Sequence, residues 1–269
     1  MLRIGCVKYL NARPLIRGCR AEVEFDHPSA LCERLANGEL DIALVSSFEF
    51  LRNPIYRIID DVSISSDGPV YSVVVVHRDE ISKIDEIVLD PASETAVNLL
   101  RCLLGELGLY PHLKQRNTGI SPVVVKSGSA APAQLLIGDQ AIHFRESHAD
   151  EFQFWDLGEQ WKKLMGLPFV YALWLIRPEV RDPKTIADGL RALRDENLAD
   201  LDELIAEVVV GVGDPGAEEK FDPEFYSRYY HEHLRFSFGK EEKEGLRTFA
   251  QLCAKRGLLP GGGIAFDLV

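Results

Sequence analysis

The chain lacks a surplus of basic residues: 30 lysines and arginines stand against 42 aspartates and glutamates, for a net charge of −12. This balance argues against nucleic acid or an anionic membrane as the main partner, because both are bound through basic side chains. A small anionic ligand stays compatible, since helix N-termini can make a cleft locally positive. Disorder is disfavoured as well, because 46% of the residues are hydrophobic and can fill one large core or two modest ones.

Paired cysteines and long apolar runs are also missing. The five cysteines have irregular spacing and form no C-x-x-C motif, which indicates reduced and mostly buried thiols. No apolar stretch has the length of a membrane span. The chain passes from Met1 directly into a strand pattern, without the features of a signal peptide. We therefore expect a cytoplasmic protein with no membrane partner.

Several motif matches carry little weight. No P-loop occurs, and residues 211–216 (GVGDPG) fit G-x-G-x-x-G only formally, because they follow a helical pattern and include a proline. We interpret them as a loop that ends a helix. His231 and His233 have no matching partners for a metal site. His143 and His148 are interpreted as surface histidines near the edge of a cleft.

Strand and helix patterns alternate in the first part of the chain. Strands are predicted at 3–7, 21–25 and 41–45, with helices between them. This order is typical of a doubly wound α/β lobe. Pro14 lies three residues after Asn11, which suggests a short helix that begins near Asn11.

The pattern recurs further along. Strands are predicted at 86–89, 122–126 and 133–137. Two long β-rich runs, 68–80 and 166–179, each begin near a glycine and a proline and end in charged residues. We interpret these runs as the strands that cross between two lobes, out and back.

The expected fold is therefore α/β and two-lobed, like type II periplasmic binding proteins, whose lobes close over a ligand by a hinge motion. Lobe 1 is predicted to comprise residues 1–84 and 178–269, and lobe 2 residues 85–177, with the ligand cleft between them. After residue 179 the apolar spacing is helical. This C-terminal segment is expected to pack on the first lobe.

Polar residues follow several predicted strands, where ligands bind in open α/β sheets. Asn11, between a strand end and a helix start, is either a helix cap or a ligand contact. Ser72 begins a crossing strand, where it either alternates along the strand or faces the cleft. Ser93 and Thr95 belong to the first turn of a predicted helix, whose N–H groups favour a carboxylate.

Five segments in register resemble the chorismate dehydratase family, the first enzymes of the futalosine route to menaquinone. The resemblance covers the chain in order from residue 5 to 177, with a compatible helical tail. The segments are 9–15 (YLNARPL), 38–45 (GELDIALV), 66–72 (SDGPVYS), 136–139 (LIGD) and 156–169 (DLGEQWKKLMGLPF).

The resemblance implies a carbon–oxygen lyase that removes water from chorismate, a small anion, to give 3-[(1-carboxyvinyl)oxy]benzoate. No metal or organic cofactor is implied. The family's functional asparagine and serine fall on Asn11 and Ser72, which are the predicted catalytic residues. The family more often has arginine at Glu94, so this side chain is expected to point away from the substrate. Predicted substrate-binding residues are Ser46, Ser47, Asp67, Gly68, Ser93, Thr95, Gly138 and Asp139.

The implied reaction needs little acid–base power, because loss of a ring proton and a hydroxyl leaves an aromatic ring. A closed, dry cleft that orients the substrate suits it. Asn11 would hold the leaving hydroxyl or the ring carboxylate, and Ser72 would fix a carboxylate or assist proton transfer. The motifs contain no obvious base, so the substrate's own enolpyruvyl carboxylate is the hypothetical proton acceptor.

Three other functions compete with this one. A sister enzyme of the same fold makes 1,4-dihydroxy-6-naphthoate with a histidine directly after the Leu-Ile pair, where this chain has Gly138; His143 lies too far along to match. A non-catalytic solute-binding protein would normally carry a secretion signal. The effector lobe of a transcription regulator would need a helix-turn-helix segment and a more basic charge.

Overall fold

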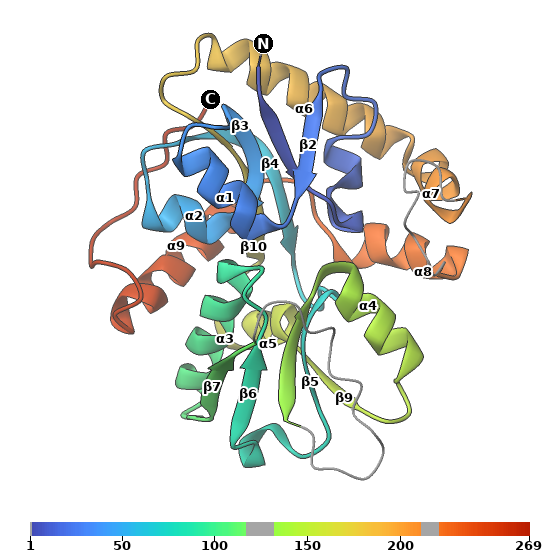
Figure 1. Cartoon of the computed structure of the whole chain (residues 1–269), viewed down its shortest axis with the longest axis vertical. Helices are drawn as coiled ribbons and strands as arrows, with labels where there is room; N and C mark the ends of the chain where they lie inside the picture. Colours follow the sequence, from blue (N-terminus) through green and yellow to red (C-terminus); the bar gives the residue numbers. More distant parts are fainter. Residues whose placement is uncertain (1, 117–131, 211–220) are drawn as a thin grey trace.

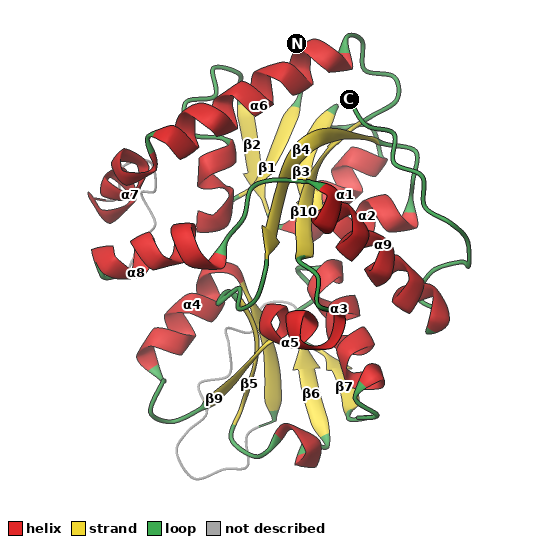
Figure 2. Ribbon diagram, turned by 180° about the vertical axis from the view of Figure 1, so that it is seen from behind, coloured by secondary structure: helices red, strands yellow, loops and turns green. Residues whose placement is uncertain are grey.

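Two sheets organise the chain. The structure, a computed structural model, describes residues 2–116, 132–210 and 221–269. In these residues two five-stranded sheets lie one beyond the other along the longest axis of the molecule, with helices around each (Figures 1 and 2). We call the first sheet and the helices packed on it lobe 1, and the second sheet with its helices lobe 2. The expected two-lobed α/β fold is confirmed.

Lobe 1 contains the sheet β2-β1-β3-β10-β4. Strands β1, β2 and β3 run parallel, and β10 is antiparallel to both of its neighbours. Every residue of β3 and β10 is buried, as expected for apolar strands that are covered on both faces. The strands are β1 (Ile4–Val7), β2 (Val23–Asp26), β3 (Ile42–Ser46), β4 (Arg57–Ser66) and β10 (Phe169–Ile176).

The helices of lobe 1 come from both ends of the chain. The first group, η1 (Leu10–Leu15), α1 (Pro28–Ala36) and α2 (Ser47–Arg52), connects the early strands. The second group follows β10 and includes a π-helical turn, η3, directly after α8. Its members are α6 (Pro183–Ala199), α7 (Leu201–Val210), α8 (Pro223–Arg228), η3 (Tyr229–His233) and α9 (Lys240–Lys255).

Lobe 2 contains the sheet β7-β6-β8-β5-β9. Strand β6 runs parallel to β7 and β8, whereas β5 is antiparallel to β8 and β9. The strands are β5 (Val73–His77), β6 (Glu86–Leu89), β7 (His112–Gln115), β8 (Ala133–Ile137) and β9 (Gln153–Asp156), and the helices are η2 (Ile81–Lys83), α3 (Glu94–Glu106), α4 (Gly138–Ser147) and α5 (Leu157–Met165).

The sheets correct the expected lobe boundaries. Strand β5 belongs to the second sheet, although the predicted boundaries assigned it to lobe 1 (residues 1–84). Strand β10 belongs to the first sheet, although they assigned it to lobe 2 (residues 85–177). The chain changes sheets at 67–72 and 166–168, before each long apolar run. The glycine and proline residues make the crossings, and the runs that follow are interior strands, because their apolar side chains need cover on both faces.

Polar residues before helical patterns predict helix caps at Ser29, Ser93 and Asp156, with Asn11 as a fourth candidate, and two of the four are confirmed. Ser93 caps α3 by accepting from the Ala96 N–H at 3.3 Å, and Asp156 caps α5 by accepting from the Glu159 N–H at 3.1 Å. Helix α1 instead begins at Pro28, so Ser29 lies inside it. Asn11 also lies inside its helix, because η1 begins at Leu10. The predicted strand at 122–126 and the loop at 211–216 lie outside the described residues.

The C-terminal segment packs on both lobes, not on the first lobe alone. Helix α9 lies against β10, and its end also reaches α3 of lobe 2. Glu106 on α3 accepts from Lys255 Nζ at 3.0 Å and from Arg256 Nη2 at 2.6 Å. Nearby, the buried sulfur atoms of Cys102 and Cys253 are 3.7 Å apart. The last helix therefore connects the two lobes at a distance from the crossings.

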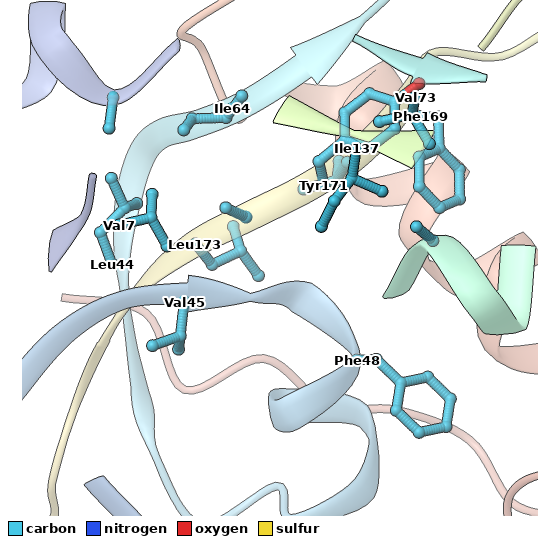
Figure 3. Packing of buried hydrophobic residues seen from close by; sticks show 14 of the residues in the cluster. Val7, Leu44, Val45, Phe48, Ile64, Val73, Ile137, Phe169, Tyr171 and Leu173 are labelled. Carbon is cyan, nitrogen blue, oxygen red and sulfur yellow. The ribbon is translucent and has the colours of Figure 1, made fainter. Parts of the chain in front are cut away.

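One buried cluster continues from lobe 1 into lobe 2. Figure 3 shows part of it, with Leu44, Val45 and Leu173 from the first sheet and Val73 and Ile137 from the second. Burying each such aliphatic side chain contributes roughly 1.5–3 kcal/mol, so the contact between the lobes is itself a stabilising core. Among the described helices, none has the length and apolar character to cross a membrane.

The ion pairs at Glu106 predict how stability depends on pH. Hydrogen bonds, first from Lys255 and then from Arg256, hold the pKa of Glu106 below its ordinary value of 4.5. A lowered folded pKa means that the pairs stabilise the fold above that ordinary value, and that this stability is lost as pH falls through the folded pKa. Glu106→Gln should therefore lower the melting temperature at pH 7 by about 1–3 °C, and by progressively less as pH falls through the lowered folded pKa of Glu106.

Thermal unfolding of both proteins from pH 3 to pH 7 measures this difference. Added salt should shrink it at pH 7, because these charges are partly exposed and screened. A difference that stays constant down to pH 3 would mean that the substitution acts through packing instead.

Candidate functional site

Polar residues from both lobes meet where the sheets face one another. Strand β3 of lobe 1 ends at Ser46, helix α2 follows with Ser47, and Thr95 in the first turn of α3 of lobe 2 lies beside both. The Phe48 N–H donates to Thr95 Oγ1 at 3.0 Å, and the Thr95 N–H donates to Ser46 Oγ at 3.2 Å. The hydroxyls of Ser46 and Thr95 also contact each other. Three residues predicted to bind the substrate are thus brought together, but in this structure they contact one another across the two lobes.

Gly138 lies in close contact with Tyr9 of lobe 1. Its φ of +61° lies in the left-handed region, and a Cβ there would lie 2.8 Å from carbon atoms of the Tyr9 ring. Glycine is therefore required twice over, by backbone conformation and by space. A histidine cannot take this position while Tyr9 fills it, which argues against the sister enzyme's arrangement.

Asp139 connects α4 to the start of η1. Its carboxylate accepts from the Leu10 N–H, at 3.0 Å to Oδ1 and 3.3 Å to Oδ2. The C-terminal segment also holds the backbone of Leu10, because Tyr230 donates its hydroxyl to the Leu10 carbonyl at 2.8 Å. Asn11, the next residue, is therefore placed by contacts from both lobe 2 and the C-terminal segment.

Asn11 does not serve as a helix cap. Tyr9 occupies the N-cap position of η1, and Asn11 follows inside the first turn. Its amide oxygen Oδ1 is buried and has no hydrogen-bond partner among the described residues. An unpaired buried acceptor costs about 1–3 kcal/mol, so it is rare unless it has a role. The capping alternative is wrong, and the ligand-contact alternative gains support.

Ser72 follows a residue with an unusual backbone. Tyr71 has a φ of +69°, a conformation that costs roughly 1–3 kcal/mol for a residue with a side chain. The buried Asp156 holds it there by accepting from the N–H groups of Val70 and Tyr71, at 3.1 and 2.8 Å. The Ser72 carbonyl accepts from the Gly138 N–H at 2.8 Å. Strain of this kind is concentrated at functional sites.

The Ser72 side chain is buried and contacts a residue that the sequence did not single out. Tyr229, on the π-helical turn η3, donates its hydroxyl to Ser72 Oγ at 2.8 Å. Burial raises the pKa of both Tyr229 and Tyr230 above the ordinary value, so both stay protonated donors. The aromatic run around 225–230 was the available signal, but nothing in its spacing indicates contact with Ser72.

Asp67 and Gly68 belong to the crossing between sheets. Asp67 accepts from Arg235 Nη2 at 2.7 Å and also pairs with Lys162. Gly68 has a φ of +136°, and its carbonyl accepts from Ser66 at 3.0 Å. For the described residues, these contacts join α5 and the C-terminal segment to the crossing. They do not join the other predicted site residues.

Glu94, expected to point away from the substrate, forms an ion pair between the lobes. Its carboxylate pairs with Arg52 Nη1 of α2 at 2.7 Å and is 44% exposed. Arg52 also pairs with the buried Glu49. A cavity of about 280 Å³ opens here between the lobes, lined in part by Ser46, Arg52 and Glu94. The arginine thus offsets the negative charge of Glu94.

The ring of His143 on α4 contacts that of Phe221, two residues before α8, with centroids 4.2 Å apart and planes tilted by 33°. Within the described ranges, no group of three or more histidine, cysteine, aspartate or glutamate side chains is arranged to hold a metal ion.

Comparison with known proteins decides the family. A profile described as menaquinone biosynthesis matches residues 2–255. The chain belongs to the menaquinone biosynthesis family. A curated relative of this family member is the chorismate dehydratase of Thermus thermophilus, 29% identical over 266 residues, with 92% of this chain and 93% of the relative covered. The resemblance carried by the sequence segments is thereby confirmed.

Solved structures confirm the fold of this family member. The alkanesulfonate-binding protein SsuA from Xanthomonas axonopodis, bound to MOPS, is 16% identical with a TM-score of 0.66, over 97% of this chain and 94% of that one. The aliphatic sulphonate binding protein SsuA from Escherichia coli is 14% identical with a TM-score of 0.64, over 97% and 94%. An Archaeoglobus fulgidus protein is 17% identical with a TM-score of 0.63, over 96% and 98%. The fold is that of periplasmic binding proteins.

The contact between Gly138 and Tyr9 makes a prediction about stability. Gly138→Ala adds both left-handed strain and a collision with the Tyr9 ring, so it should lower the free energy of unfolding by about 2–4 kcal/mol. Gly166→Ala is the matched control, because Gly166 has a φ of +72° with no atom within 4 Å of an added Cβ. The control should cost only the strain, about 1–2 kcal/mol.

Chemical denaturation of the two variants measures both costs. Combining Gly138→Ala with Tyr9→Ala should recover part of the loss, because the ring that collides is removed. Equal costs at positions 138 and 166 would show that contact with Tyr9 does not restrict position 138.

Proposed function

We propose that this protein removes water from chorismate to give 3-[(1-carboxyvinyl)oxy]benzoate, as a hydro-lyase of menaquinone biosynthesis through futalosine. The observation that carries the proposal is its relation to Thermus chorismate dehydratase over nearly the whole of both chains. Two features of the site support it. Asn11 and Ser72 lie in one hydrogen-bonded junction between the lobes, and Tyr9 leaves no room for a histidine at Gly138.

The reaction breaks a ring C–H bond and a ring C–O bond, and the proton and the hydroxide leave as water. Since the ring becomes aromatic, the protein's task is to orient the substrate and keep water away. The unpaired amide oxygen of Asn11 is an acceptor, so it suits the ring hydroxyl, which is a donor. Ser72 donates its hydroxyl proton to a substrate oxygen.

The proton acceptor is proposed to be the substrate itself. Two carboxylates lie near Ser72 and Asn11, and both accept backbone N–H groups: Asp139 from Leu10, and Asp156 from Val70, Tyr71 and Glu159. Proton uptake at either carboxylate would weaken those hydrogen bonds, although burial raises the pKa of Asp156 above its ordinary value. The enolpyruvyl carboxylate of chorismate has no such engagement and can take the ring proton.

The test is incubation of the purified protein with chorismate, followed by mass spectrometry and ultraviolet absorbance. A product lighter by one water and with aromatic absorbance is expected. Chorismate that is bound tightly and returned unchanged would indicate a solute-binding protein. Absence of both binding and turnover would overturn the proposal and direct the assay to the sister enzyme's substrate.

Asn11 gives a prediction that separates activity from stability. Asn11→Ala should lower kcat/KM about a hundredfold, the scale for loss of one positioned polar group. Its melting temperature should not fall, because the substitution removes a buried acceptor that is unpaired in the fold. Turnover and thermal unfolding of the same preparation measure both effects.

Asn197 provides the contrast for this prediction. Its buried amide donates to the carbonyl groups of Pro14 and Arg17, at 3.1 and 3.0 Å. Asn197→Ala should therefore destabilise the fold by about 1–3 kcal/mol. An Asn11→Ala protein that is destabilised like Asn197→Ala, and equally active as the original, would assign Asn11 a structural role.

A further inference from the structure

Two consecutive tyrosines contact Ser72 and the backbone of Leu10, the residue before Asn11. Tyr229 and Tyr230 open the π-helical turn η3 and are both buried. Consecutive side chains on an α-helix diverge by about 100°, so neighbouring residues can contact different elements. Tyr229 reaches the start of β5 in lobe 2, and Tyr230 reaches η1 in lobe 1. Such π-helical turns occur frequently at functional sites.

Tyr229 determines what the Ser72 hydroxyl can do. A serine hydroxyl has one proton to donate and two lone pairs that accept. Because Tyr229 donates to Ser72 Oγ at 2.8 Å, one lone pair is occupied and the serine proton must point elsewhere. Its acceptor in the fold is the Val70 carbonyl at 3.5 Å, the outer limit of a hydrogen bond. The proton is therefore free to turn to a substrate oxygen.

The position of Tyr229 is itself fixed by packing. Its ring stacks on that of Phe225, with centroids 5.7 Å apart and planes 15° from parallel. The Tyr229 side chain is fully buried, and its hydroxyl donates to the Ser72 oxygen. Any effect of the Tyr229 hydroxyl on the reaction therefore passes through Ser72.

Tyr230 acts in the same way on the other residue. Its hydroxyl donates to the Leu10 carbonyl at 2.8 Å, while Asp139 accepts from the Leu10 N–H. The backbone on the N-terminal side of Asn11 is thereby held at both of its polar groups. The direction in which the Asn11 amide projects follows from this backbone.

We propose that Tyr229 and Tyr230 are positioning residues for the dehydration, Tyr229 orienting the Ser72 hydroxyl and Tyr230 holding the backbone that carries Asn11. The inference rests on the proposed function, because it assigns these residues to the same site. It also gives the C-terminal segment a part in the chemistry, beyond packing on the lobes.

A double-mutant cycle with chorismate as substrate tests the first half. Tyr229→Phe should lower kcat/KM about tenfold, the effect of losing one hydrogen bond to a reacting group. In a Ser72→Ala background the same change should alter kcat/KM by less than about twofold, because independent sites add and coupled ones do not. A residue that only supports the fold would cost the same in both backgrounds.

A second double-mutant cycle, with Tyr230→Phe and Asn11→Ala, tests the role of Tyr230. Tyr230→Phe should lower kcat/KM about tenfold alone and by less than about twofold in the Asn11→Ala background. Tyr56→Phe is the matched control, a buried tyrosine of lobe 1 whose hydroxyl accepts from Asn53 at 3.2 Å. It should match the original protein in kcat/KM, and its melting temperature calibrates the loss of one buried tyrosine hydroxyl.

The outcomes separate cleanly. If the original protein does not dehydrate chorismate, the proposed function fails before any variant is compared. If it does, and the losses simply add in both cycles, the positioning roles are wrong while the function stands. Proton NMR of the folded protein gives an independent check: the buried Tyr229 hydroxyl should show a slowly exchanging resonance that Ser72→Ala shifts or removes. An unchanged resonance would also overturn the role of Tyr229.

Discussion

The backbone at Leu10 is the junction on which the proposed site depends. Its N–H donates to Asp139 at the start of α4, and its carbonyl accepts from Tyr230 in the C-terminal segment. Three parts of the chain that are distant in sequence therefore meet at one residue. Ser72 joins the same junction, because its carbonyl accepts from the neighbouring Gly138 N–H. The backbone at both proposed site residues is therefore held in place, beside Asn11 by the side chains of Asp139 and Tyr230 and at Ser72 by the Gly138 N–H.

Much of the fold could be predicted because its signals are local. Ser93 and Asp156 each cap a helix by accepting from the N–H three residues further on. Strands β6 and β8 end directly before a polar residue and a glycine, Asp90 and Gly138. Asn11 and Ser72 were found through the family resemblance, since each also had an ordinary structural explanation. The structure removed that explanation for Asn11, whose side chain caps no helix.

The features that the sequence did not reveal depend on distant partners. The apolar run of β5 has the same character whichever sheet it joins, so its pairing with β8 and β9 had to be seen. Tyr229 is separated from Ser72 by 157 residues, and no local pattern encodes that contact. The space above Gly138 is likewise set by the ring of Tyr9, on the other lobe.

The hydroxyl contact between Ser46 and Thr95, with Arg52 and Glu94 beside it, ties the lobes together across the proposed cleft. Periplasmic binding proteins in general spend part of their ligand's binding energy on closing. Here contacts between the protein's own groups also hold the lobes together. These contacts must break whenever the lobes separate. A molecule enclosed between the lobes would therefore leave only after the Ser46–Thr95 and Arg52–Glu94 contacts are broken.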